Sequence, residues 1–164
     1  MRRSRRALLF PTLAMLPAFV GCNAPFQPLP SIAQTTFASS LGVNLSAMTI
    51  TPDSLYYQDL VAGTGVTVTL ATIIKVEYTA WLPDGTEFDA SSAHEGENGT
   101  FSVGSGRAEG TLELAGWYEG IPGMKVGGTR LLVIPPKLGY GGNTVGMIPA
   151  NSILVYKITV VSGT

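Results

Sequence analysis

Cysteine and histidine are almost absent from this chain of 164 residues, which contains one of each. A lone cysteine, Cys22, cannot form a disulfide within the chain, and one cysteine with one histidine supplies too few ligands for a structural metal site. Charge is also scarce, since charged residues make up 13% of the chain and the formal net charge is −1. The sequence has no basic patch of the kind that binds nucleic acid. We therefore expect no metal, no cofactor and no nucleic-acid partner.

The N-terminal part lacks an apolar run long enough to cross a bilayer as a helix, for which about 20 residues are needed. An apolar stretch covers 7–20, but two prolines interrupt it. The basic sequence RRSRR precedes it at 2–6, and a glycine and Cys22 follow. A basic start, a short apolar run and a small residue before the cleavage point are typical of a secretory signal. We therefore expect 1–21 to be a signal peptide.

The end of this segment, Phe19-Val20-Gly21-Cys22, resembles a bacterial lipobox, in which the cysteine is lipidated and becomes N-terminal after cleavage. Phe19 stands where that motif usually has leucine, and an ordinary signal peptide with an incidental cysteine is the alternative. The stretch 4–9 resembles a twin-arginine signal, so the export route stays open. We expect an exported protein of the cell envelope or periplasm, anchored in the membrane by lipid at Cys22.

The next segment, 22–47, contains no charged residue and is rich in Pro, Ser, Thr, Gln and Asn. Its apolar residues follow neither a helical nor a strand period. Such a composition is typical of a flexible linker, so we expect 22–47 to tether the anchor to a single domain at 48–164.

Short strands dominate the expected domain. In 72–82, apolar residues alternate with polar ones, which predicts a strand with one buried and one wet face. Further strands are expected at 55–61, 129–134 and 152–161. The one helix candidate lies near 112–121, before Pro-Gly. These elements predict an α+β domain in which one short helix packs on a small antiparallel sheet.

Seven segments in register resemble the FKBP-type (macrolide-binding) peptidyl-prolyl cis/trans isomerases. They are VEYTAWL at 76–82, DGTEFDAS at 84–91, FSVG at 101–104, GWYEGI at 116–121, MKVG at 124–127, LGYG at 138–141 and IPANS at 148–152. The resemblance runs from about residue 48 to 161. It implies a five- or six-stranded antiparallel sheet wrapped around one short helix, with an active cleft between the helix and the concave sheet face.

The resemblance also implies a set of site residues. Trp117 would form the floor of an aromatic pocket for a prolyl ring. The walls would be Tyr78, Phe88, Phe101, Ile148 and Tyr156, and the polar groups Asp89, Tyr140 and the backbone N–H of Leu114. Tyr156 stands where the family commonly has phenylalanine. Glu113 falls where an apolar residue usually lines the rim, and two loops, 89–101 and 104–114, are longer than usual.

These residue types suit the chemistry of prolyl isomerisation. The barrier of an Xaa–Pro bond, about 18–20 kcal/mol, arises from amide resonance. A dry aromatic pocket favours the twisted, less dipolar amide over the planar one, and polar groups at its rim can hold the twisted geometry. No nucleophile, metal or cofactor is needed, so His94 is interpreted as a solvated residue of a polar insertion.

We therefore expect a peptidyl-prolyl isomerase that acts on exported, proline-containing polypeptides and assists folding. The resemblance further implies binding of macrolides such as tacrolimus or rapamycin. The alternative is a non-catalytic module that uses the same cleft, or its long loops, to hold a peptide or partner.

Overall fold

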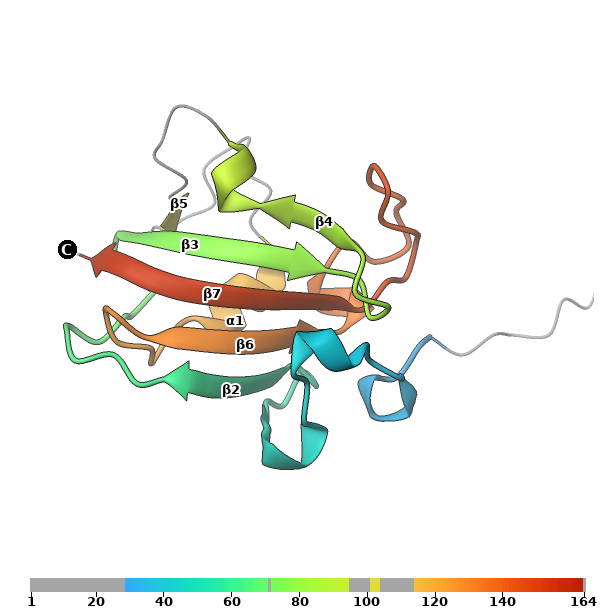
Figure 1. The fold of residues 1–164 in the computed structure, drawn as a ribbon, viewed down its shortest axis with the longest axis horizontal. Coiled ribbons are helices and arrows are strands. Elements are labelled where there is room, and N and C mark those ends of the chain that lie inside the picture. The colour runs from blue at the N-terminus through green and yellow to red at the C-terminus, as the bar shows by residue number, and fades with distance from the viewer. Residues whose placement is uncertain (1–28, 71, 95–100, 104–113, 164) are drawn as a thin grey trace, which may run out of the picture.

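The computed structural model describes residues 29–70, 72–94, 101–103 and 114–163, and for 101–103 the backbone alone (Figure 1). The strands are β1 Thr49–Ile50, β2 Tyr56–Val61, β3 Ile74–Trp81, β4 Glu87–Ala90, β5 Phe101–Val103, β6 Thr129–Ile134 and β7 Leu154–Gly163. The helix α1 spans Ala115–Gly120, and 3-10 turns span η1 Ile32–Gln34, η2 Ser39–Leu41, η3 Leu45–Ala47, η4 Ser91–Ala93 and η5 Pro136–Leu138.

One antiparallel sheet contains all of these strands, in the order β1-β2-β6-β7-β3-β4. β5 lies off this path and pairs with the beginning of β3, whose end pairs with β4. The expected strands match β2, β3, β6 and β7, and the expected antiparallel sheet with one short helix is confirmed. Six strands lie on its main path, where five or six were expected, and β5 is a seventh. No helix among the described residues is long and apolar enough to cross a membrane.

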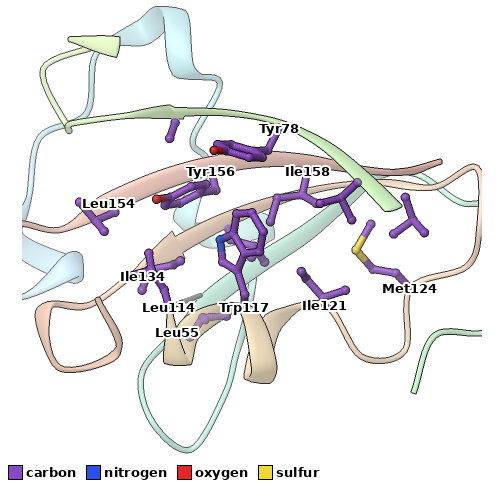
Figure 2. Packing of buried hydrophobic residues seen from close by; sticks show 14 of the residues in the cluster. Leu55, Tyr78, Leu114, Trp117, Ile121, Met124, Ile134, Leu154, Tyr156 and Ile158 are labelled. Carbon is purple, nitrogen blue, oxygen red and sulfur yellow. The ribbon is translucent and has the colours of Figure 1, made fainter. Parts of the chain in front are cut away.

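The helix α1 covers one face of the sheet, behind the strands in the view of Figure 1. Two glycines bring it close to β6: a Cβ on Gly116 would lie 2.6 Å from Cγ2 of Ile134, and one on Gly120 would lie 2.9 Å from Cδ1 of Leu132. The alternation predicted for β3 and β7 is observed, since the inward residues of both strands belong to the same buried cluster as α1 (Figure 2). Burial of this face supplies the main apolar core.

Part of the other face of the sheet is covered by residues 29–47, which corrects the expectation of a flexible tether for these residues, whereas 22–28 lie outside the described part of the chain. Residues 29–47 contain three 3-10 turns, η1 to η3, which lie near one end of β6 and β2 in Figure 1. Ile32 is 4% exposed, and it packs in a second buried cluster with Leu131 and Val133 of β6. Phe37 and Leu45 lie against the same cluster. The segment has no sequence period because single 3-10 turns present side chains at irregular intervals.

This second layer also corrects the expectation that one face of 72–82 is wet. Lys75 and Glu77 are exposed as expected, but Trp81, on the same face, is half-buried against the second cluster. The residues of β6 from Arg130 to Ile134 are all buried, so other parts of the protein pack on both faces of this strand. A strand with apolar residues on both faces must be packed on both sides.

Candidate active site

Three aromatic side chains from three elements meet on the helix-covered face of the sheet. Trp117 comes from α1, Tyr78 from β3 and Tyr156 from β7, and Figure 2 shows the two tyrosine rings above the tryptophan. The centroids of Tyr78 and Trp117 lie 5.1 Å apart, and those of Trp117 and Tyr156 lie 5.5 Å apart, both edge-on. All three side chains are buried. Such edge-to-face pairs stabilise a fixed arrangement of rings.

A β-bulge brings two consecutive residues of β4 to this cluster. The pairing of β3 with β4 passes from Ala80–Asp89 to Trp81–Glu87 and leaves Phe88 without a partner. In a regular strand Phe88 and Asp89 would point to opposite faces, but a bulge re-aims side chains. Phe88 lies 5.8 Å from the ring of Tyr156, centroid to centroid, and the hydroxyl of Tyr78 donates to Oδ2 of Asp89 at 2.7 Å.

The hydroxyl groups of three tyrosines surround the polar edge of the cluster. Burial and the hydrogen bond to Asp89 raise the pKa of Tyr78 far above its ordinary value. Burial, and then the neighbouring Tyr140 and Tyr78, raise the pKa of Tyr156 likewise. Burial also raises the pKa of Tyr140, and the hydrogen bond that it accepts from Tyr156 works in the opposite direction. These hydroxyls therefore stay neutral at physiological pH and remain able to donate hydrogen bonds.

The structure brings together most of the residues expected at the site. Leu114 is the N-cap residue of α1, and Ile148 sits in a tight turn whose backbone pairs it with Val145. Both are buried in the cluster of Trp117, and Phe88 and Tyr140 pack against that cluster while partly buried. Phe101 lies in β5, opposite Val76, and the position of its side chain is outside the description. Glu113 lies outside the described residues.

His94 is a site neighbour that the sequence interpretation missed. It follows η4, and its Nε2 lies 2.8 Å from Oδ1 of Asp89. The expectation of a merely solvated side chain was therefore incomplete, because the exposed ring contacts the carboxylate at the edge of the cluster. Its position five residues after Asp89 was visible in the sequence, but the contact depends on η4, the 3-10 turn that brings the chain back.

A nearby hollow shares Trp117 with this arrangement but none of its polar groups. It is lined by Val68, Leu70 and Thr72 together with Trp117 and the end of α1, and its cavity volume is about 10 Å³. That volume accommodates one water molecule at most. The tyrosine hydroxyls and Asp89 are not among its lining residues. We therefore place the site at the aromatic cluster and its polar edge.

The arrangement suits binding of an apolar ring and a weakly held amide. The rings of Tyr78, Trp117 and Tyr156 supply a surface that excludes water. The hydroxyl of Tyr140 can donate beside it, because the hydroxyl protons of Tyr78 and Tyr156 are engaged by Asp89 and Tyr140. Hydrogen bonds in such a dry environment are stronger than in water. The carboxylate of Asp89 fixes the hydroxyl of Tyr78.

Comparisons with known proteins identify the family of the domain that carries this cluster. The family model of FKBP-type peptidyl-prolyl cis-trans isomerases matches residues 65–161. The FKBP-type peptidyl-prolyl cis-trans isomerase FkpA of Aeromonas hydrophila is 40% identical over 108 residues, covering 66% of this chain and 37% of that protein. An FK506-binding protein of Neisseria meningitidis serogroup C is 39% identical over 106 residues, covering 64% of this chain and 92% of that protein.

Among solved structures, FkpA from Escherichia coli superposes with a TM-score of 0.60 at 34% identity, covering 72% of this chain and 52% of that chain. The chain thus spans about a third to a half of the FkpA proteins and almost all of the Neisseria protein. Because the family model covers more than half of the chain and includes α1 and the aromatic cluster, the chain belongs to the FKBP-type peptidyl-prolyl cis-trans isomerases.

Proposed function

We propose that this isomerase acts on Xaa–Pro bonds of exported proteins, outside the cytoplasmic membrane, and assists their folding. The observation that carries the catalytic part is the buried cluster of Tyr78, Trp117 and Tyr156, with the Asp89 carboxylate at its edge. Export is supported by the basic and apolar sequence of 1–21, which has the pattern of a secretory signal.

The mechanism needs only desolvation and positioning. A planar amide is more dipolar than a twisted one, so water stabilises the ground state by hydrogen bonding to the carbonyl oxygen. When the prolyl ring rests on Trp117, the surrounding rings replace that water and the twisted state is favoured. A rate increase of about a hundred-thousand-fold requires about 7 kcal/mol of transition-state stabilisation.

Macrolide binding is part of the same proposal. Tacrolimus and rapamycin carry a pipecolyl ring that resembles proline, and a relative in Neisseria meningitidis is named an FK506-binding protein. Trp117 would contact such a ring, whereas Trp81 lies on the opposite face of the sheet. Binding should therefore change the fluorescence of Trp117, and a Trp81→Phe variant should keep this change.

The decisive experiment is cis/trans exchange on Xaa–Pro peptides by the purified chain. Phe88→Ala should lower kcat/KM by removing a wall of the cluster, and Asp89→Ala should lower it by freeing the hydroxyl of Tyr78. Both variants should remain folded, because both side chains are only partly buried. Peptide binding without exchange would instead indicate a non-catalytic binding module. If both variants fold and keep the wild-type kcat/KM, the active site does not lie at the aromatic cluster.

Anchoring at Cys22 is tested separately in cells. A palmitate analogue should label the wild-type protein and fail to label Cys22→Ser. Equal labelling of the two, or recovery of the wild-type protein in the soluble fraction, would contradict lipidation and favour an ordinary signal peptide.

A further inference from the structure

The carboxylate of Asp89 is held on both of its oxygens. The hydroxyl of Tyr78 donates to Oδ2 at 2.7 Å, and Nε2 of His94 lies 2.8 Å from Oδ1. The two contacts come from different sides, since Tyr78 belongs to β3 within the core and His94 follows the 3-10 turn η4. Together they set the orientation of the carboxylate at the edge of the aromatic cluster.

Among the residues that the structure describes, His94 is the side chain in contact with Asp89 whose charge can vary near neutral pH. Three tyrosine hydroxyls face the carboxylate, those of Tyr78 from β3, Tyr140 after η5 and Tyr156 from β7, and burial keeps them neutral. Charged residues on the packing strands point away. Glu87 of β4 pairs with the outward Trp81, and β3 and β7 present their exposed charges, Lys75, Glu77 and Lys157, on that outward face.

His94 is also the one histidine of the chain. Histidine is the side chain that ordinarily changes charge between about pH 5 and 8. When His94 is neutral, the pair with Asp89 carries one negative charge, and when it is protonated the pair is neutral overall. The side chain of His94 is 50% exposed and that of Asp89 is 32% exposed, so a bound peptide and solvent protons can both reach the pair.

We propose that His94 is a positioning residue that makes the charge preference of the isomerase depend on pH. The proposal rests on the isomerase activity. At higher pH the uncompensated Asp89 attracts a basic residue beside the proline and repels an acidic one. At lower pH the charge-assisted hydrogen bond from His94 neutralises this field and holds the carboxylate more firmly. The preference for basic over acidic sequences around proline thus weakens as acidity rises.

The test compares blocked Lys-Pro, Glu-Pro and Ala-Pro peptides at about pH 5.5 and about pH 8, where the side chains of the peptides keep their charges. For unit charges about 6 Å apart in water, Coulomb's law gives about a threefold effect. Raising the pH should therefore raise kcat/KM for Lys-Pro about threefold and lower that for Glu-Pro about threefold, with Ala-Pro unchanged. Low salt keeps the effect measurable.

Two variants of the full chain fix the charge at position 94, one as neutral and one as positive. His94→Gln should remove the pH dependence and keep the wild-type preference seen at high pH. His94→Arg should also remove it and keep the preference seen at low pH. As a matched control, Lys137→Gln removes an exposed ion pair of the same length, 2.8 Å, with Asp53 outside the site, and it should retain the wild-type pH dependence.

The outcomes separate this proposal from the isomerase activity itself. Lack of exchange with Ala-Pro in the wild type would overturn the activity. Normal exchange with a Lys-Pro to Glu-Pro ratio that is independent of pH, or a pH dependence that persists in His94→Gln, would overturn the role of His94. If His94 had a purely structural role, kcat/KM would fall equally for all three peptides in both variants. That result would also overturn the proposed role of His94.

Discussion

Replacing Ile32 by alanine tests whether the N-terminal segment is part of the folded domain. Ile32 is 4% exposed and packs against the face of the sheet opposite to α1, with Leu131, Val133 and Val155. The substitution removes three carbon atoms from this contact. At about 0.8 kcal/mol for each buried methylene, with a small cavity term, the free energy of unfolding should fall by about 2–3 kcal/mol.

The measurement is urea unfolding followed by tryptophan fluorescence. Trp81 packs against the same cluster as Ile32, and Trp117 reports on the opposite face, so one experiment follows both layers. In thermal unfolding, the same loss should lower Tm by about 5–10 °C. Exchange on Xaa–Pro peptides at low temperature should be unaffected, because Ile32 is not in the cluster of Trp117.

Leu29 offers a matched control in the same segment. It is 60% exposed, so Leu29→Ala removes a similar number of atoms from a side chain that is mostly in water. Its effect should stay below about 0.5 kcal/mol. If neither Ile32→Ala nor Leu29→Ala changes the free energy of unfolding, the segment does not stabilise the sheet. The interpretation of the segment as a tether would then be correct.

Three further predictions concern the core. Gly116→Ala should destabilise the fold by about 1–3 kcal/mol, because its new Cβ would overlap a side chain of β6. Denaturant unfolding measures this loss, and an unchanged free energy of unfolding would contradict the close approach of α1 to β6. Arg130→Ala should lower the free energy of unfolding by about 2–4 kcal/mol. The buried guanidinium donates two hydrogen bonds to Asp59, at 2.7 and 3.0 Å, and one to a backbone carbonyl of α1. A double-mutant cycle with Asp59→Ala separates the energy of the ion pair from that of the other contacts of Arg130. Finally, the raised pKa of Tyr156 means that its stabilising contribution is complete below the ordinary tyrosine pKa of about 10 and is lost as pH rises above it. Tyr156→Phe should therefore flatten the decline of unfolding free energy above about pH 10, and an unchanged alkaline slope would contradict this.

Local sequence patterns determined much of this protein. Alternation in 72–82 and 152–161 predicted which residues of β3 and β7 face the helix, because a strand repeats every two residues regardless of its neighbours. The family resemblance carried by the motifs pointed to Tyr78, Trp117 and Tyr156, which meet in one cluster. For these residues the resemblance and the tertiary structure agree.

Tertiary structure alone decided three other features. The residues of 29–47 are packed because both faces of β6 are apolar, a property of a strand far along the chain, and irregular 3-10 turns leave no period to detect. The bulge at Phe88 depends on how β4 pairs with β3, and it places Phe88 and Asp89 on the same cluster against simple alternation. The contact of His94 with Asp89 depends on η4 in turn. Sequence patterns report the period of one element, whereas register, bulges and layer contacts arise from pairing between elements, and those contacts determine the polar edge of the site.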